Sequence, residues 1–368
     1  MNIVTAYSTK GTVEEVVQDI KNQLADFQLR MLLYFASSNF EPKTLSLKMK
    51  QALPSDHQFG CTTAGEIVNG LMLKNSVVAM AFNQKVISDV AVEVIENLKQ
   101  GIDVKKAAAS FEAHFKEPLS AMSIRKYVGI ILIDGLSFSE EKLMDKVGNL
   151  TNVIFIGGSA SDDLKFSATH VFANGKAYSN AAVLALAKPG VAFDFIKTQS
   201  FCTLPKKLVA TKVNEAERTV IEFNNKPAAT AYAEAIGSSV ADATKRFMHN
   251  PVGLMMENEP YVRSPQRIDN GKMVFYCNIK EGMELSVLES TDIVRDTRQA
   301  VEKKAKELGT ISGIINFQCI LRTLELEQKN QTEEYGRIFS DIPTVGFSTY
   351  GEDFIGHVNQ TSTMLVFR

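Results

Sequence analysis

Two stretches of the chain, residues 60–70 and 346–356, repeat one pattern of glycine, hydroxyl and acidic residues. Aligned on Gly60 and Gly346, both have glycine at the first, sixth and eleventh positions, a hydroxyl at the third and fourth, and glutamate at the seventh. A looser copy, Gly157-Gly-Ser-Ala-Ser-Asp-Asp163, follows the apolar run 153–156. A short apolar run that leads into such residues is typical of a strand ending in a polar turn. The recurrence predicts related parts of the chain that meet at a shared site.

The N-terminal part predicts alternating strands and helices. Strands are expected at 2–7, 29–36 and 58–61, with helices at 13–27 and 42–52 between them. The order then changes, because the strand-like stretches 76–82 and 86–95 are separated by only Asn83-Gln84, which predicts a hairpin. A helix (104–115), a strand (127–133) and a helix to residue 147 follow.

Turn residues mark the boundaries of the elements expected in the remainder of the chain. Asn174-Gly175, between strand-like 170–173 and 176–178, is a strong type I′ hairpin signal. A second hairpin is expected at 208–213 and 219–223, followed by a helix with Pro227 at its first position. Further elements are a helix ending at Gly309, a buried strand (311–317) and a terminal strand (362–367).

The expected fold class is α/β with mixed α+β sheets, built from two related halves, residues 1–200 and 201–368. A four-layer helix-sheet-sheet-helix arrangement is the first expectation, and two separate α/β domains are the alternative.

Composition excludes several classes of protein. A formal charge of −2 provides no field for nucleic acid, and no apolar run approaches the ~20 residues of a membrane span. The N-terminus lacks a secretory pattern, so a cytoplasmic protein is expected. The four cysteines, at 61, 202, 277 and 319, are too far apart in sequence to indicate a zinc site or redox dithiol.

The motifs also resemble those of the FIST proteins, a family of sensory domains in intracellular signal transduction with an N-terminal and a C-terminal half. The matching stretches occur in the family's order at 60–67, 156–162, 225–228, 251–254, 261–264, 281–282 and 346–361. The resemblance implies a cytoplasmic sensor that binds an amino acid or related metabolite between its halves. It also implies a separate signalling partner, such as a histidine kinase, a chemotaxis component or a cyclic-dinucleotide enzyme. No metal or cofactor is expected.

The candidate ligand-binding residues come from the motifs and this resemblance together. They are Cys61, Thr62, Thr63, Glu66, Gly158, Ser159, Asp162, Arg263, Ser264, Ser348, Thr349, Tyr350, Glu352, His357 and Asn359. Consecutive backbone N–H groups and hydroxyls in such turns suit an anion or a polar small molecule, although the glycines could equally serve only tight turns. Glu66 and Glu352 either meet across a pseudo-dyad or accept hydrogen bonds within their own turns. Arg263 is the preferred cation for a carboxylate, with a structural salt bridge as the alternative.

Three other functions stay open. A haem-binding, nitric-oxide-sensing branch of the family would need an iron ligand, and His249 is the candidate, although Asn250 separates it from Pro251. An enzyme could use Cys61 as a nucleophile, but no His or Asp is tied to it by a recognised spacing. A protein-interaction scaffold would have no ligand pocket.

Overall fold

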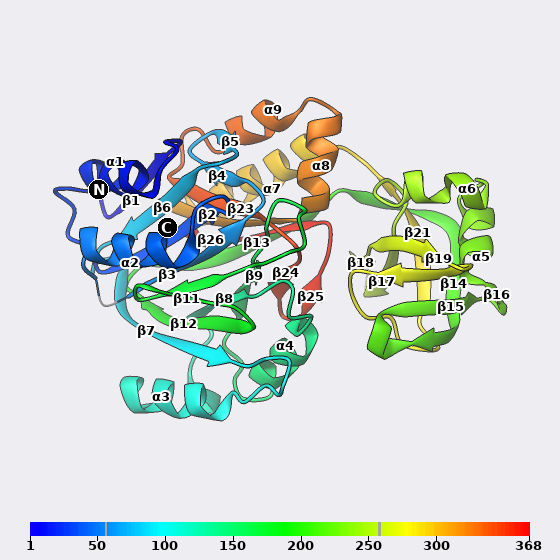
Figure 1. Cartoon of the computed structure of the whole chain (residues 1–368), viewed down its shortest axis with the longest axis horizontal. Helices are drawn as coiled ribbons and strands as arrows, with labels where there is room; N and C mark the ends of the chain where they lie inside the picture. Colours follow the sequence, from blue (N-terminus) through cyan, green and yellow to red (C-terminus); the bar gives the residue numbers. More distant parts are fainter. Residues whose placement is uncertain (56, 257–258) are drawn as a thin grey trace. The chain divides into compact units, whose positions relative to one another are not determined.

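The computed structural model describes residues 1–55, 57–256 and 259–368 and divides them into two compact domains (Figure 1). The core domain comprises residues 1–198, 297–357 and 362–368, and the insert domain comprises 199–296 and 358–361. These domains do not follow the sequence halves 1–200 and 201–368, because most residues after 296 return to the core domain.

Three copies of one strand-helix-strand-helix-strand-hairpin-strand unit make up the core domain. The first copy contains β1 (Ile3–Ser8), α1 (Val13–Gln23), β2 (Met31–Ser37), α2 (Pro42–Ala52), β3 (Gln58–Thr63), β4 (Glu66–Val68), β5 (Leu71–Leu73) and β6 (Val77–Phe82). The second contains β7 (Ile87–Glu96), α3 (Lys105–Phe115), β8 (Val128–Ile133), α4 (Glu140–Gly148), β9 (Phe155–Ser159), β10 (Val171–Ala173), β11 (Lys176–Tyr178) and β12 (Ala181–Pro189). The third contains β13 (Phe193–Gln199), α7 (Ile293–Leu308), β22 (Gly313–Cys319), α8 (Ile320–Gln328), α9 (Thr332–Arg337), β23 (Thr344–Thr349), β24 (Glu352–Phe354), β25 (His357–Val358) and β26 (Thr361–Phe367).

Each copy forms a sheet that a hairpin from another copy completes. The first sheet has the order β1-β6-β2-β3-β10-β11, the second β7-β12-β8-β9-β24-β25 and the third β13-β26-β22-β23-β4-β5. The central pairs β2/β3, β8/β9 and β22/β23 are parallel and their other neighbours antiparallel, which confirms the prediction of mixed sheets. The hairpin of the first copy joins the third sheet, that of the third joins the second, and that of the second joins the first. The exchange is therefore cyclic.

One apolar core lies among the three sheets. Phe35 of the first sheet packs on Phe347 of the third at 4.5 Å between ring centroids, and Ile130 and Leu132 of the second sheet join the same cluster. Separate apolar clusters fill the spaces between the first sheet and helices α1 and α2, and between the second sheet and α3 and α4. The core is thus enclosed by three sheets, where a four-layer arrangement would have two.

Local signals explain one hairpin and mislead about another. Asn174 and Gly175 have φ of 47° and 87°, so the predicted β10/β11 hairpin is confirmed. The hairpin predicted across Asn83-Gln84 is wrong, since β6 pairs in the first sheet and β7 in the second. Both strands instead turn apolar side chains toward the shared core, where they pack across it and do not pair edge to edge.

The insert domain is a curled antiparallel sheet. Its elements are β14 (Phe201–Asn214), β15 (Thr219–Phe223), β16 (Lys226–Pro227), α5 (Ala228–Ala235), α6 (Val240–Ala243), β17 (Val252–Met256), β18 (Glu259–Arg263), β19 (Pro265–Asp269), β20 (Lys272–Phe275) and β21 (Glu284–Ser290). The strand order is β18-β17-β21-β14-β15-β20-β19. The two edge strands, β18 and β19, are consecutive in the chain and are joined through Ser264. One continuous stretch therefore closes the sheet around an apolar core. The predicted β14/β15 hairpin is confirmed, and Pro227 lies one residue before the helix.

Candidate functional site

The three glycine-hydroxyl turns meet within the core domain. A ring of backbone hydrogen bonds joins them in cyclic order: Ala64 N–H to the Ser348 carbonyl (3.4 Å), Tyr350 N–H to Ser159 (3.3 Å) and Ser161 N–H to Thr62 (2.9 Å). Donors and acceptors occupy equivalent positions in the three copies, so the turns surround a pseudo-threefold axis. The meeting predicted from the repeated motif is therefore observed, with the looser copy as a full third member.

The first glycine of each motif is required by close packing of the parallel strands. A Cβ added to Gly60 would lie 1.8 Å from the carbonyl oxygen of Tyr34. The corresponding distances are 1.7 Å from Gly157 to Ile131 and 2.3 Å from Gly346 to Asn316. No side chain fits at these separations, so glycine is needed here for space and not for a positive φ.

The turns do not expose consecutive N–H groups, so that expectation is wrong. Their amides are used by the ring and by neighbouring contacts, such as Ser348 N–H to the Gly65 carbonyl at 2.8 Å. The hydroxyls are buried and occupied as well: Ser159 donates to Glu140 at 3.0 Å, and Thr349 donates to the Ser159 carbonyl at 2.7 Å. The motif residues hold the junction together, and Gly158 packs beside Thr349.

Glu66 is satisfied within its own turn. It is buried, and its carboxylate accepts hydrogen bonds from the Thr63 hydroxyl and from the amide and hydroxyl of Ser76. Burial raises the pKa of Glu66 to about 7 although these bonds oppose the shift. Glu352 is also buried and lies opposite Gly158 in the second sheet, whereas Glu66 lies in the third sheet. The two glutamates are therefore related by the pseudo-threefold axis, and not by the pseudo-dyad considered from the sequence.

A loop inserted after Ser161 distinguishes the second motif from the others. One residue separates the ring donor from the next strand in the first motif (Gly65) and in the third (Gly351), whereas 162–170 intervene here. Tyr350 ties this loop down: its hydroxyl donates to Asp162 at 2.5 Å and accepts from the Leu164 amide at 2.8 Å. Burial raises the pKa of Asp162, but hydrogen bonds from Tyr350 and three loop amides outweigh it and hold the pKa below its ordinary value. Phe166 stacks on the Tyr350 ring at 5.0 Å.

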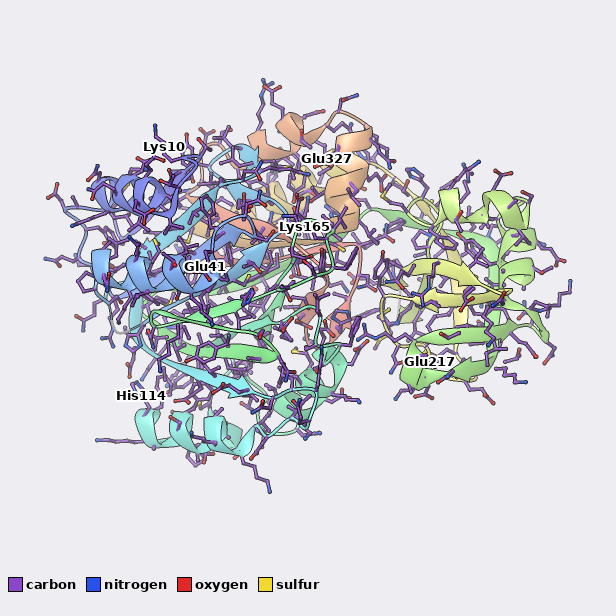
Figure 2. All side chains as sticks on the ribbon, in the orientation of Figure 1. Lys10, Glu41, His114, Lys165, Glu217 and Glu327 are labelled. Carbon is purple, nitrogen blue, oxygen red and sulfur yellow. The ribbon has the colours of Figure 1, made fainter. Side chains whose placement is uncertain are left out.

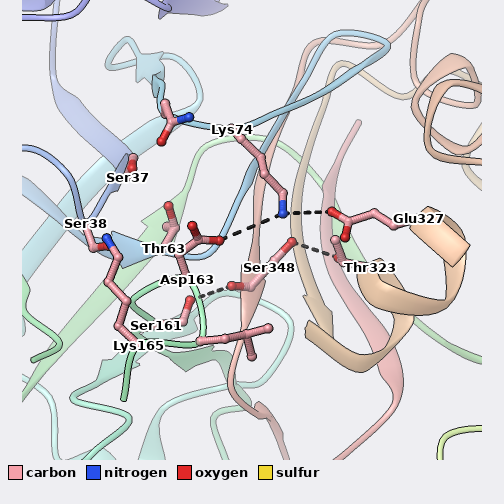
Figure 3. Close-up of polar contacts among 12 residues, drawn as sticks. Ser37, Ser38, Thr63, Lys74, Ser161, Asp163, Lys165, Thr323, Glu327 and Ser348 are labelled. Carbon is pink, nitrogen blue, oxygen red and sulfur yellow. Dashed lines mark hydrogen bonds and ion pairs between the residues drawn. The ribbon is translucent and has the colours of Figure 1, made fainter. Parts of the chain in front are cut away.

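Beside this loop lies a partly exposed group of charges, which we call the Lys74 surface. Its members are Lys74, Asp163, Lys165 and Glu327, with Thr323 and Ser348 beneath them. Lys74 lies between Glu327 (2.9 Å) and Asp163 (3.9 Å), as Figure 3 shows. Thr323 and Ser348 share a hydrogen bond of 2.8 Å, and Lys165 donates to Asn39 at 2.7 Å. Figure 2 labels Lys165 and Glu327 among the side chains of the core domain.

Sequence reasoning missed most of the Lys74 surface. Lys74, Lys165, Thr323 and Glu327 belong to no motif, and they come together only because a hairpin, a loop and a helix from different copies converge. Asp163 belongs to the looser copy of the motif but is not among the candidate residues.

His357 belongs to a second buried polar group. Its Nδ1 lies 3.3 Å from Asp353, and its ring packs against Gly351. Burial lowers the pKa of His357, but Asp353, Glu141 and Glu140 outweigh this and raise it to about 9. Burial raises the pKa of Asp353 to about 6. The imidazole is thus an internal counter-ion.

Three further candidates, Arg263, Ser264 and Asn359, belong to the insert domain. Arg263 donates to the Val262 carbonyl at 3.2 Å, and within the described part of the chain no carboxylate forms an ion pair with it. Ser264 donates to Gln360 at 2.7 Å, and Asn359 is buried and donates to the Val358 carbonyl.

His249 and Cys61 are the candidate residues for two alternative functions, a haem-binding sensor and a thiol enzyme. His249 is half-buried, with Nδ1 3.4 Å from the Ser290 hydroxyl. A hollow of about 240 Å³ in the insert domain does not include His249 among its lining residues, which are Lys206, Lys207, Leu208, Asn224, Lys226, Ala231, Glu234 and Ala235. Such a polar lining does not fit a haem. Cys61 is fully buried in the apolar core, and burial, with a contribution from Glu66, raises its thiol pKa well above the ordinary value, which opposes a nucleophilic role.

Two further properties concern the described residues as a whole. Across 1–55, 57–256 and 259–368, no helix combines the length and the apolar character needed to cross a membrane. Nor do these residues include a group of three or more His, Cys, Asp or Glu side chains placed to hold a metal ion.

Comparison with known proteins identifies the family. The FIST N domain matches residues 30–226 and the FIST C domain matches residues 228–354. An uncharacterized protein of Methanocaldococcus jannaschii, MJ1623, is 24% identical over 321 residues, which cover 82% of this chain. The chain spans only 62% of the length of that relative. Since the two domain matches cover most of the chain in the expected order, the chain belongs to the FIST family of sensory domains in signal transduction.

Proposed function

We propose that the protein is a sensor that binds a small zwitterionic molecule, such as an amino acid or a related metabolite, at the Lys74 surface. The observation that carries this proposal is the position of the Lys74 ammonium group between two carboxylates, Asp163 and Glu327, over the hydrogen-bonded hydroxyls of Thr323 and Ser348. A second ammonium group, that of Lys165, comes from the same loop as Asp163. A zwitterion presents the complementary charges. In this proposal the motif residues form the floor of the site and hold its shape, whereas the sequence predicts that they bind the ligand.

The existing ion pairs are suited to exchange for a ligand. The side chains of Lys74, Asp163 and Glu327 are 48%, 40% and 34% exposed. Exposed ion pairs contribute only about 0–1 kcal/mol, so little free energy is lost when a ligand carboxylate takes Lys74 from Glu327. Glu327 and Asp163 would then receive the ligand ammonium group, and Tyr350 with Phe166 would hold the adjoining loop.

Signalling would pass to a separate partner. A histidine kinase, a chemotaxis component or a cyclic-dinucleotide enzyme is the class of partner that membership of a sensory family supports. We favour a binding role over catalysis. The cytoplasmic location stays a prediction, which fractionation would test.

The test is a thermal-shift screen of the twenty common amino acids and their keto acids, followed by calorimetry of any hit. We expect binding that Lys74→Met weakens at least about tenfold, since it removes a charged hydrogen bond. Lys48→Met is the matched control, because Lys48 forms a similar surface pair with Glu14 at 2.7 Å, away from the turns. A ligand that binds equally well to Lys74→Met would place the site elsewhere.

A further inference from the structure

The third sheet carries buried Asn, Gln and Ser side chains at positions where, apart from the hydrogen-bonded hydroxyl of Tyr34, the other two sheets carry apolar groups. The positions of Asn316, Gln318 and Ser362 are related by strand register to positions in the first and second copies. In place of Asn316, the first sheet has Tyr34 and the second has Ile131. In place of Gln318 they have Ala36 and Ile133, and in place of Ser362 they have Val77 and Ala182. Because buried polar groups cost stability unless they are hydrogen-bonded, this difference within one chain points to a role other than folding.

These residues belong to a continuous hydrogen-bonded network, in which no residue is more than 1% exposed. Ser362 donates to Asn316 (2.7 Å), Asn316 to Tyr335 (3.1 Å), Tyr335 to Gln318 (2.5 Å), and Arg322 to both Gln318 (3.3 Å) and Thr297 (2.8 Å). A fully buried guanidinium is costly to desolvate, so its hydrogen bonds must stay well formed. The network therefore acts as one rigid unit.

Its two ends coincide with the points where the chain leaves the insert domain. Thr297 directly follows Asp296, the last residue of the long insert segment, and Ser362 directly follows Thr361, the last residue of the short one. The network thus holds both returning segments of chain from within the core domain.

Helix α8 brings the Lys74 surface into contact with this network. Thr323, which shares a hydrogen bond with Ser348, is the neighbour of Arg322 in the helix. Glu327, which pairs with Lys74, lies one turn further on. A displacement of α8 that follows a change at Glu327 would also displace the Arg322 guanidinium.

We infer that the network from Ser362 to Thr297 couples the Lys74 surface, through α8, to the two chain segments that return from the insert domain. The inference rests on the proposed function for its input signal, but the coupling itself can be measured without a ligand. Loosening the network should loosen both returning segments and leave the first and second copies unchanged.

The experiment is hydrogen–deuterium exchange with mass spectrometry on the full chain. Arg322→Met and, as a milder change that keeps the ring, Tyr335→Phe should each accelerate exchange about threefold to tenfold in peptides that cover 292–298 and 357–363. Lys48→Met should have no such effect. Faster exchange throughout the core domain would show a merely structural role, and unchanged exchange in both peptides of a folded variant would overturn the inference.

Lys74→Met separates this inference from the proposed function. It should accelerate exchange in the same two peptides. In the double variant Lys74→Met/Tyr335→Phe, the acceleration should be smaller than the sum of the accelerations in the two single variants. If Lys74→Met abolishes amino-acid binding without altering the peptides, the coupling fails and the proposed function stands. If no amino acid binds but Lys74→Met and Tyr335→Phe still alter the peptides, the coupling stands and the proposed function fails.

Discussion

Asn69 and Asn174 make the same contact in two different hairpins. The Oδ1 of Asn69 accepts a hydrogen bond of 3.0 Å from the Thr344 amide, and the Oδ1 of Asn174 accepts one of 3.0 Å from the Gln58 amide. Both residues are left-handed, at φ of 39° and 47°. The third hairpin has Ile355 in this place, at φ of 62° and 71% exposed, with an unfavourable backbone conformation for a β-branched side chain.

We expect Ile355→Asn to raise the free energy of unfolding by about 1 kcal/mol, because asparagine tolerates the left-handed conformation that isoleucine adopts at a cost. Urea denaturation measures the change. Ile355→Val is the control and should give no gain, since valine is also branched at Cβ. A loss of stability in Ile355→Asn would mean that the isoleucine side chain contributes packing that the structure does not indicate.

Gly346→Ala should destabilise the core domain by about 3 kcal/mol or more, because its Cβ would overlap the backbone of Asn316 and force the parallel pair β22/β23 apart. Gly148→Ala is the matched control, since a Cβ there meets nothing within 4 Å, and a change within about 0.5 kcal/mol is expected. Chemical denaturation compares the two variants. Similar values for both would show that the strands separate easily.

Tyr350→Phe should free the loop at 162–168 without unfolding the domain. The change removes two hydrogen bonds, to Asp162 and from Leu164, at a cost of about 1–3 kcal/mol. Limited proteolysis should then cut in this loop sooner than in the wild type. Tyr7→Phe, on the exposed edge strand β1, should leave the cleavage pattern unchanged. Cleavage at the wild-type rate in Tyr350→Phe would mean that the loop amides bound to Asp162, together with Phe166 stacking, hold the loop without the hydroxyl.

Glu66 should make the protein less stable as the pH rises. Its pKa is about 7 when folded and near 4.5 ordinarily, so the folded state holds the proton more tightly. This contribution to stability is fully present below about pH 4.5 and is lost as the pH rises through 7, by at most about 3 kcal/mol. Urea unfolding between pH 5 and 8 should show a shallower decline for Glu66→Gln than for the wild type. Parallel declines would mean that Glu66 is already ionised in the folded protein across this range.

Thiol labelling should distinguish Cys202 from the other cysteines. Cys202 is exposed, whereas Cys61, Cys277 and Cys319 are buried. A maleimide at neutral pH should therefore modify Cys202 rapidly and the other three only after denaturation. Peptide mass spectrometry reads the order. Labelling of Cys61 as fast as Cys202 would revive the thiol-enzyme alternative.

Local sequence signals predicted local structure well. Asn174-Gly175 specifies its own turn, because two left-handed residues are needed there and both types tolerate them. Asn83-Gln84 has no such glycine, and the strands beside it find partners in different sheets. Which strand pairs with which depends on packing across the shared core, and residue spacing in one chain does not encode that directly.

The site was predictable only in part. The repeated turns were found because the close strand approach at Gly60 and Gly346 demands glycine, while the inserted loop disguised the third turn. That the Thr62 and Ser348 hydroxyls are buried could not be read from the pattern, since an exposed and a buried turn use the same residues. Lys74 and Glu327 left no signal because their proximity arises from the fold alone.

The cyclic exchange of hairpins has a consequence for synthesis of the chain on the ribosome. Every strand of the first sheet has been made once residue 178 emerges. After β12 and β13 have also emerged, the second sheet still lacks β24 and β25, and the third lacks β22, β23 and β26, until residues 313–367 follow. Strand β9 and the hairpin β4/β5 therefore wait with unpaired edges, which are prone to aggregate. Growing chains of this length should depend on chaperones until their last strands arrive.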